Sequence, residues 1–243
     1  MRWLEADWPA PDCIKAGTTL RQGGVSSPPY DSFNLATHVD DDLAKVNQNR
    51  AVLNESLNLS GEPQWLEQIH STEAVVLPNE VAIPKADASY TTDKNIVCAV
   101  MTADCLPLLI TDKEGSCVAA IHAGWRGLCD GIVEATIKKL PVEAEALMVW
   151  LGPAIGAGVY EVGKEVYDAF TKAHEEAKQA FTSTSEGHWL FDIYWLARLR
   201  LNKIGVTQIY GGDHCTFSEE DNFFSYRRDD VTGRMASLIW IES

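Results

Sequence analysis

The chain has 243 residues, of which 46% are hydrophobic and 23% are charged, and its net charge is −15 at pH 7. This length accommodates one large domain or two small ones, and the composition is that of a soluble globular protein with a sizeable core. A chain this anionic repels phosphate backbones and anionic lipid, so we expect no nucleic-acid partner and no membrane partner. A small anionic substrate is still compatible with the charge, because a local group of arginines can override the overall field.

The six cysteines form no Cys-x-x-Cys pair, and several lie in apolar contexts such as NIVCAV and GSCVAA. This pattern favours reduced, buried thiols over a disulfide framework. The N-terminal MRWLEADWPAPD has acids and prolines where a signal peptide needs a continuous apolar stretch, and no uncharged run reaches the length of a membrane span. We therefore expect a cytoplasmic protein.

The first third of the chain alternates strand and helix signals. Residues 16–35, AGTTLRQGGVSSPPYDSFNL, predict a strand that runs into a loop rich in Gly, Ser and Pro. Residues 40–59 predict a helix, because aspartates at its start complement the helix dipole and apolar residues follow at roughly helical spacing. The segments at 64–70 (QWLEQIH) and 73–78 (EAVVLP) are strand-like, with a turn between them.

From residue 96 the pattern changes to short apolar runs that are typical of buried central strands. These runs are IVCAVMT at 96–102, LPLLIT at 106–111 and VAAIHA at 118–123. The short EGS turn between the last two predicts a hairpin over residues 106–121.

The remainder predicts three helices and three strands. The helices are expected at 127–140, closed by Pro141, at 163–181 and at 192–205, and the strands at 146–155, 206–212 and 236–242. No linker and no short-period repeat interrupts the chain. We therefore predict an α+β fold in which residues 1–243 form a single domain, with a large mixed β-sheet flanked by helices.

Four of the six histidines have ordinary surroundings. His174 lies on a charged helical face and His188 in a loop, and both are interpreted as solvated side chains. His38 precedes a helix and fits a capping role as well as a site role. His214 lies beside a cysteine at a strand end, and its role is left open.

His70 and His122 each close an apolar strand-like segment, and Cys105 lies between two such segments. Side chains at strand ends of open α/β sheets often face the functional crevice. Three interpretations compete: packing in the core, a thiolate–imidazolium pair of Cys105 with His122, and a zinc site made by all three side chains. Two imidazoles and one thiolate would leave the fourth zinc position open, although the sequence spacing matches no local zinc motif.

Arginines next to Gly-rich or aromatic turns are a second group of candidate functional residues. Arg21 follows a strand, Arg126 lies in HAGWRG, and Arg227–Arg228 lie in FFSYRRDD. Guanidinium groups and turn amides bind oxyanions, and the neighbouring Trp125 and Tyr226 can stack on a flat heterocycle. Together they suit a planar base on a sugar with a phosphate nearby, although such pairs also occur as ordinary packing.

Several blocks of the chain resemble one known family. They are TTLRQGGVSSPPYDSFNL, WLEQIH, MTADCLP, HAGWRG, GPAIGAGVYEVG, GGDHCT and FFSYRRDDVTGRMAS, which together span residues 18–237. The chain is similar to the bacterial laccase-domain family, also called the polyphenol-oxidase-like or peptidoglycan-editing-factor family. Two departures are visible: Gly158 and Val159 stand where many relatives have a cysteine, and Ser71 follows the histidine where relatives often have glycine.

The resemblance implies a zinc-dependent purine nucleoside phosphorylase that also deaminates adenosine. Its metal ligands would be His70, Cys105 and His122, and its substrates would be phosphate with adenosine, inosine, guanosine or methylthioadenosine. Zinc would polarise phosphate or water, and a zinc-activated water would attack C6 of adenine in deamination.

Further roles are assigned as expectations to residues beside these ligands. Asp104 is a candidate proton shuttle or orienting partner of Cys105, or a turn residue. Arg21 and Arg126 are expected to contact phosphate. Asn34 and Gln68 are candidates for contacts to ribose or base.

Three other functions are weighed against this one. A copper polyphenol oxidase needs many histidines, often in close pairs, and this chain has six scattered ones. An amidase that edits a peptidoglycan precursor would use Cys105 as nucleophile, or a zinc-bound water. A non-catalytic binding protein is disfavoured by the intact ligand trio. We expect a monomer.

Overall fold

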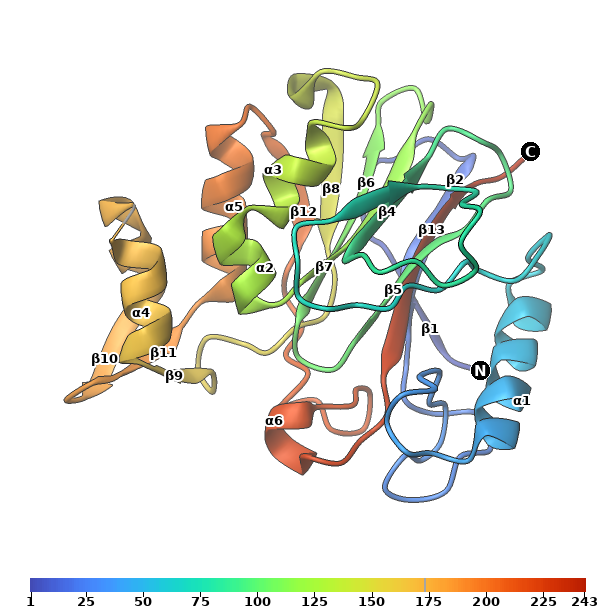
Figure 1. Ribbon diagram of the computed structural model, residues 1–243, viewed down its shortest axis with the longest axis horizontal. Helices are drawn as coiled ribbons and strands as arrows, with labels where there is room; N and C mark the ends of the chain where they lie inside the picture. The colour runs from blue at the N-terminus through green and yellow to red at the C-terminus, as the bar shows by residue number, and fades with distance from the viewer. Residues whose placement is uncertain (173) are drawn as a thin grey trace.

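The computed structural model describes residues 1–172 and 174–243. These residues form a mixed α/β domain with three β-sheets, the largest of which is six-stranded and contains both parallel and antiparallel pairs. The prediction of a single α+β domain with a large mixed sheet and flanking helices is confirmed (Figure 1).

The six-stranded sheet has the order β12-β8-β6-β7-β4-β3. Only β12–β8 and β3–β4 pair in parallel among its neighbours. The predicted hairpin is present as the antiparallel pair β6–β7. The strands of this sheet are β3 (Ala74–Val76), β4 (Ala88–Thr91), β6 (Leu106–Asp112), β7 (Val118–Ala123), β8 (Leu147–Leu151) and β12 (Gln208–Gly211).

A four-stranded antiparallel sheet packs face to face on the six-stranded one. Its order is β1-β2-β13-β5, with strands β1 (Trp3–Glu5), β2 (Ile14–Thr19), β13 (Met235–Ile241) and β5 (Cys98–Thr102). The core between the sheets includes Val100 and Ile239 from one sheet and Leu109 and Ala120 from the other. Because both faces of the central strands are covered, these strands are apolar on both sides.

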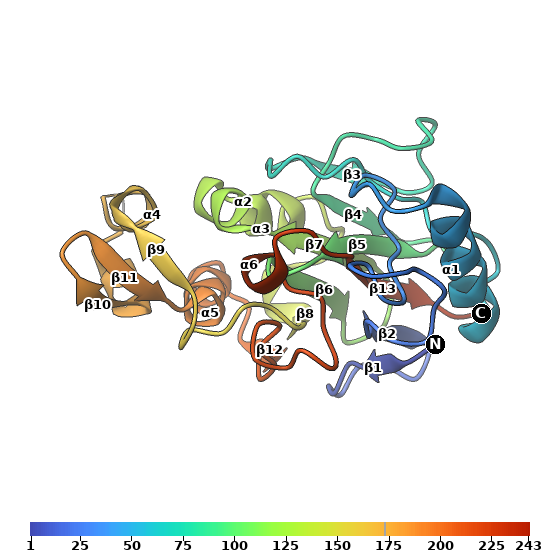
Figure 2. The same ribbon diagram turned by 90° about the horizontal axis from the view of Figure 1, so that it is seen from below.

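Helices complete the outer layers. The other face of the six-stranded sheet is covered by α2 (Trp125–Asp130), α3 (Ile132–Ile137) and α5 (Ile193–Lys203). Helix α1 (Leu43–Ser56) covers the outer face of the four-stranded sheet, at the opposite end of the molecule from α5 (Figure 2). It begins as its aspartates predict, because the Asp42 carboxylate accepts the backbone N–H of Ala44 at 2.9 Å.

A small unit projects beside α5 (Figures 1 and 2). It contains α4 (Lys164–Thr171), the 3₁₀ helix η2 (Glu175–Ala180) and a three-stranded sheet of β9 (Glu161–Gly163), β10 (Phe181–Ser185) and β11 (His188–Phe191). The prediction of a loop at His188 is therefore wrong, because this residue begins β11. The short elements η1 (Ala144–Ala146) and α6 (Tyr226–Asp229) were not predicted.

Three element predictions are corrected. The segment 64–70 is not a strand; it has one isolated bridge, from Glu67 to Lys85. The helix expected at 127–140 is two helices, since Gly131 has φ +102° between them. The helix expected at 163–181 ends at Thr171, and residue 173 lies outside the described residues.

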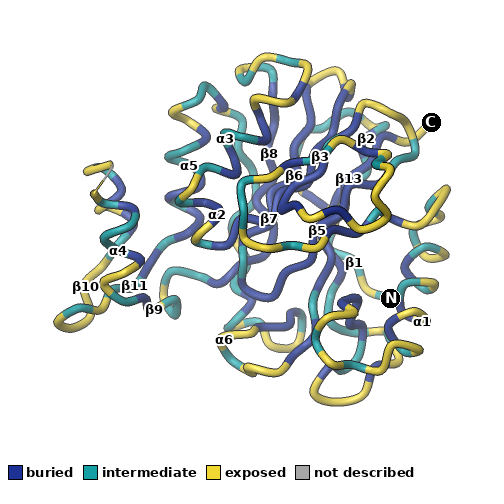
Figure 3. The backbone as a smooth tube through the Cα atoms, in the orientation of Figure 1, coloured by how far each residue is buried: buried dark blue, intermediate teal, exposed yellow. Residues whose placement is uncertain are grey.

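Burial follows the layers, with the central strands buried and the outer loops exposed (Figure 3). All six cysteines are free thiols, as predicted. None of the helices among the described residues combines the length and the apolar character that crossing a membrane requires.

Candidate metal centre

His70, Cys105 and His122 lie together where the two large sheets meet. His122 belongs to β7, Cys105 directly precedes β6, and His70 lies in the loop before β3. Their potential ligand atoms are all within 4.8 Å of one another, and the Cys105 Sγ atom is 3.8 Å from His70 Nε2. The three residues, which are 35 and 17 positions apart in the chain, therefore form one cluster. A thiolate–imidazolium pair of Cys105 and His122 alone would leave out His70.

Asp87 connects the two histidines of this cluster and is fully buried. Its Oδ1 atom accepts the Nδ1–H of His122 at 2.8 Å and the backbone N–H of His70 at 3.0 Å. Its Oδ2 atom accepts the backbone N–H groups of Ser71 at 2.6 Å and Ile69 at 3.2 Å. One carboxylate therefore fixes the ring of His122, with Nε2 free for the cluster, and the backbone that carries His70.

The same carboxylate explains why residues 64–70 are not a strand. The amides of residues 69–71 donate to Asp87 instead of to a neighbouring strand, and His70 has φ +58°. Although burial opposes ionisation, the hydrogen bonds from His122 and Ser71 lower the pKa of Asp87 to about 2. Asp87 was missed from the sequence, where it is a single acid between two alanines.

Gly124 leaves the space that the cluster occupies. A Cβ atom at this position would lie 2.6 Å from His70 Cδ2 and 3.1 Å from Cys105 Sγ. The glycine of HAGW therefore lets β7 end directly beside the ligand atoms.

The cluster changes the acidity of its own groups. Burial opposes the Cys105 thiolate, but the neighbouring His122 and His70 lower the pKa of the thiol to about 6. Burial likewise opposes the imidazolium of His122, and Cys105 and Asp87 raise its pKa to about 9. Burial raises the pKa of Cys98, in the core between the sheets, to about 12. Cys105 is thus distinguished from a core thiol by its readiness to form a thiolate.

These three side chains fit a tetrahedral metal ion with N and S ligands. A thiolate and an imidazole on one zinc ion lie about 3.5 Å apart, close to the 3.8 Å between Cys105 Sγ and His70 Nε2. The donor set of one thiolate and two imidazoles is typical of zinc, and the trio leaves a fourth position open. It is the one group of three or more potential metal ligands found in residues 1–172 and 174–243.

The centre opens into a cavity of about 430 Å³. Of the residues expected to contact substrate, Gln68 and the stacking candidate Tyr226 lie in its wall. The Gln68 amide exchanges two hydrogen bonds with the backbone of Met101 at 2.7 and 2.8 Å. The complete lining is His38, Gln68, His70, Met101, Thr102, Ala103, Cys105, His122, Tyr226 and Arg234.

Asp104 lies next to Cys105, but its carboxylate is bound to another segment. Its Oδ1 accepts from the Thr216 hydroxyl and its Oδ2 from the backbone N–H of Arg227, both at 2.6 Å. Asp104 therefore connects the turn before β6 to α6, and it is absent from the cavity lining.

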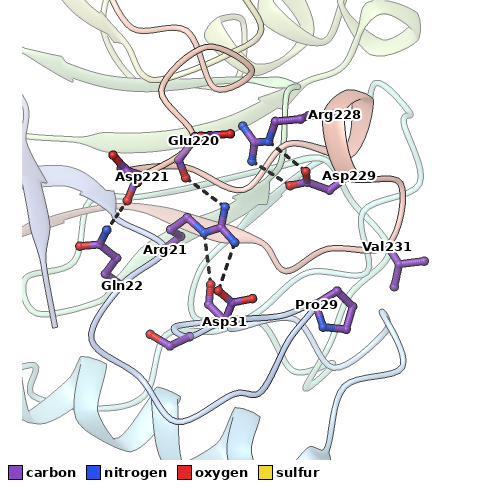
Figure 4. Close-up of a pocket in the computed structure, with 10 residues that line it drawn as sticks. Arg21, Gln22, Pro29, Asp31, Glu220, Asp221, Arg228, Asp229 and Val231 are labelled. Atoms are coloured by element: carbon purple, nitrogen blue, oxygen red, sulfur yellow. Dashed lines mark hydrogen bonds and ion pairs between the residues drawn. The ribbon is translucent and has the colours of Figure 1, made fainter.

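Arg21 lines a different cavity, of about 520 Å³ (Figure 4). Its guanidinium donates to the backbone oxygens of Asp31 at 3.2 Å and Glu220 at 3.0 Å, and it pairs with the Asp31 carboxylate at 3.5 Å. These contacts join the loop after β2 to residues 220–221, so the structure does not bring Arg21 to the centre.

Asn34 and Arg126 are also outside the wall of the 430 Å³ cavity. Asn34 is fully buried, and its Oδ1 accepts the backbone N–H of Arg234 at 3.0 Å. Arg126 is exposed, lies over the Trp125 ring and pairs with Glu165 at 3.7 Å.

The remaining histidines differ in their surroundings. His38 lines the cavity, and Asp42 rather than His38 caps α1. His174 is exposed, as expected of a solvated side chain, but precedes η2 rather than lying on a helix. His214 contacts the Glu219 carboxylate at 3.1 Å and lines another cavity. Arg234 was missed from the sequence, although the TGRMAS block contains it.

A family model described as multi-copper polyphenol oxidoreductase laccase matches residues 15–242. The chain belongs to this laccase-domain family. It is 51% identical over 241 residues to a protein of Pseudomonas aeruginosa named purine nucleoside phosphorylase, covering 99% of this chain and 98% of the other. It is 50% identical to the purine nucleoside phosphorylase YfiH of Escherichia coli, covering 96% of both chains.

Solved structures show the same fold. A crystal structure of a Neisseria meningitidis protein superposes with a TM-score of 0.95 at 48% identity and covers 100% of both chains. The YlmD structure from Geobacillus stearothermophilus gives a TM-score of 0.91 at 30% identity and covers 100% of this chain and 97% of the other. The resemblance inferred from the sequence motifs is confirmed at the level of family and fold.

Proposed function

We propose that the protein is a zinc-dependent purine nucleoside phosphorylase that uses the His70–Cys105–His122 centre. The observation that carries the proposal is that this centre opens into a cavity of about 430 Å³. A cavity of this size is within the range that takes up small ligands. The printed names of relatives about half identical over nearly the whole chain support the same activity.

The reaction joins phosphate to the ribose of a purine nucleoside. An oxygen of phosphate forms a bond to C1′ while the bond from C1′ to the purine nitrogen breaks. The electron pair of that bond moves to the purine, which takes up a proton, and the products are the free base and a sugar 1-phosphate. A zinc ion held by His70, Cys105 and His122 would supply a Lewis acid at the cavity wall.

Three residues have separate roles in the cavity and behind it. Tyr226, which is 54% exposed, offers an aromatic ring on which a purine can stack. Gln68 is held by both of its hydrogen bonds to Met101 and forms a rigid polar wall. Asp87 keeps both histidines in the geometry that the metal needs.

Adenosine deamination is proposed as a second activity of the same centre. Its support is the donor set: three protein ligands leave the position that an activated water requires. A multi-copper oxidase is not supported, because the described residues contain one such ligand group rather than several.

The deciding experiment is product analysis with adenosine and the zinc-loaded protein, with and without phosphate. We expect adenine only when phosphate is present and inosine in both cases. Adenine formation that does not depend on phosphate would refute the phosphorylase; no inosine would refute the deaminase alone.

Variants connect these activities to the metal. Cys105→Ala is expected to lower bound zinc from about one equivalent by 10-fold or more and to abolish both activities, because it removes one of the three ligands. Cys129→Ala, at a partly buried thiol of α2, is the matched control and is expected to keep its zinc. If Cys105→Ala keeps full zinc by elemental analysis, the metal assignment is wrong, and the amidase with a free Cys105 nucleophile gains support.

A further inference from the structure

Arg234 is the only arginine or lysine in the wall of the 430 Å³ cavity, and no aspartate or glutamate of the described residues belongs to that wall. It directly precedes β13, where Met235 pairs with Thr102 at the end of β5. The molecule as a whole carries a net charge of −15. A cationic wall without carboxylates is therefore a local exception that attracts an anion.

The donors of Arg234 are only partly used inside the protein. Its Nη1 group donates to the backbone oxygens of Thr232 at 2.9 Å and Gly233 at 3.0 Å. Within the described part of the chain, Nε and Nη2 have no hydrogen-bond acceptor, and the guanidinium forms no ion pair. By contrast, Arg21 is paired with Asp31, and Arg126 with Glu165.

A backbone hydrogen bond and close packing hold Arg234 in position. Asn34 accepts its backbone N–H at 3.0 Å and also donates to the Asp41 carboxylate at 3.0 Å. A Cβ atom on Gly233 would lie 2.7 Å from the Phe224 ring, so this glycine allows the close packing. Asn34, expected to contact substrate, thus positions the arginine instead.

A second polar group in the same wall lacks a partner. Thr102 is 2% exposed, and its hydroxyl has no hydrogen-bond partner in the structure. Buried hydroxyls are almost always hydrogen-bonded in proteins, so a hydroxyl of a cavity-lining residue that has no protein partner is available to a ligand atom. A guanidinium edge and a hydroxyl that line the same cavity and have no protein acceptor or partner match the several oxygens of a phosphoryl group.

We propose that Arg234 and Thr102 form the binding site for a phosphoryl oxyanion in this cavity, with the free edge of the guanidinium as its principal donor. This inference rests on the proposed function, for which the anion is the inorganic phosphate that attacks C1′. The 5′-phosphate of a nucleotide has the same chemistry and is the other source. Arg21 and Arg126 take no part in this site.

The test is direct titration of zinc-loaded full-length protein with inorganic phosphate in a calorimeter, without nucleoside. Arg234→Gln is expected to weaken phosphate binding about 10- to 100-fold, since charge-assisted hydrogen bonds are lost. Zinc content should stay unchanged, and the melting temperature should fall slightly because the Nη1 hydrogen bonds to Thr232 and Gly233 are lost. Arg2→Gln, which removes one exposed positive charge outside the cavity, should bind phosphate like the parent.

A second variant keeps the proposal testable if Arg234→Gln folds poorly. Thr102→Val removes the unpartnered hydroxyl and keeps the shape, so the fold should be at least as stable as before. Phosphate binding is expected to weaken about 3- to 10-fold. Titration with adenosine 5′-monophosphate distinguishes the sources: inorganic phosphate is the ligand if the variants weaken only its binding, and a nucleotide phosphate if they weaken only binding of the monophosphate.

Unchanged binding of both ligands in Arg234→Gln and Thr102→Val would overturn the proposal. So would a loss of phosphate binding in Arg21→Gln or Arg126→Gln but not in Arg234→Gln. These titrations measure binding without turnover, so they test the anion site separately from the phosphorylase activity. If phosphate binds through Arg234 but adenosine gives no adenine, the phosphorylase fails while the anion site stands.

Discussion

At the scale of single residues, the centre depends on a carboxylate that is not itself a ligand. Asp87 accepts a ring N–H from His122 and three backbone N–H groups from residues 69–71. The two histidines are therefore oriented by one fully buried side chain. Such partners typically contribute about 10- to 100-fold to metal affinity.

Asp87→Asn is expected to lower zinc affinity about 10- to 100-fold, because an amide N–H₂ would face N–H donors. It is also expected to destabilise the fold by about 1–3 kcal/mol, since buried donors lose their acceptor. The measurements are zinc competition with a chelating dye and denaturant unfolding.

Asp112→Asn is the matched control for Asp87→Asn. Asp112 is 3% exposed and accepts the backbone N–H of Ser116 at 2.6 Å in the turn between β6 and β7, away from the ligands. It should lose stability but keep zinc affinity. Equal zinc affinities in the two variants would contradict the role assigned to Asp87.

The three candidate ligands are visible in the sequence and Asp87 is not, for a physical reason. His70, Cys105 and His122 interrupt or end apolar runs, so each is visible locally as a polar group at the edge of a core segment. Asp87 acts through groups 16 to 35 positions away. The pairing of β4 with β7 brings it to His122, and the pairing of β3 with β4 brings it to residues 69–71. Arg234 was hidden in the same way, since its role depends on a cavity whose described lining, which comes from distant parts of the chain, contains no carboxylate.

At the scale of elements, α6 and the loop before it are held against the centre by Asp104. This residue has φ +91°, and its carboxylate binds Thr216 and the backbone of Arg227. Tyr226, the first residue of α6, lines the cavity. The geometry therefore favours a positioning role for Asp104, acting through Tyr226, over the proton shuttle that the sequence suggested.

Asp104→Asn is expected to raise the KM for nucleoside about 3- to 10-fold, since one charge-assisted hydrogen bond to α6 weakens, while kcat and zinc content stay nearly constant. Thr216→Val, which removes the other partner of the carboxylate, should show the same split in steady-state kinetics. A shuttle would instead lower kcat about 10²- to 10⁴-fold and change its pH profile in Asp104→Asn alone.

Element predictions succeeded for continuous apolar runs, whereas β4 was missed, because it is buried at three of its four residues but has the mixed sequence ASYT. The runs that became β5, β6, β7 and β8 are apolar on both faces because a sheet or a helix layer covers each face. The short strands β9, β10 and β11 were missed, because their residues are mostly exposed or half-buried and lack a continuous apolar signal. The segment 64–70 has the alternation of a strand. Alternation cannot show that backbone amides at its end donate to the distant Asp87 carboxylate.

At the scale of the whole molecule, the metal centre lies at the edge of a core that does not depend on it. The two large apolar clusters contain none of the three ligands, and they join both large sheets and the covering helices. The candidate ligands nevertheless come from the loop before β3, the turn before β6 and strand β7, so a bound ion would connect these segments. Metal binding should therefore stabilise a fold that already exists without it.

Removal of zinc by a chelator is expected to leave the secondary structure intact by circular dichroism and to lower the melting temperature. Because the ion binds the native state, each tenfold increase in free zinc above the dissociation constant should add about 1.4 kcal/mol of stability. Cys105→Ala should lose most of this dependence, whereas Cys129→Ala should retain it. Unfolding of the chelated protein at room temperature would show that the core needs the metal, and an unchanged melting temperature would show that the trio binds none.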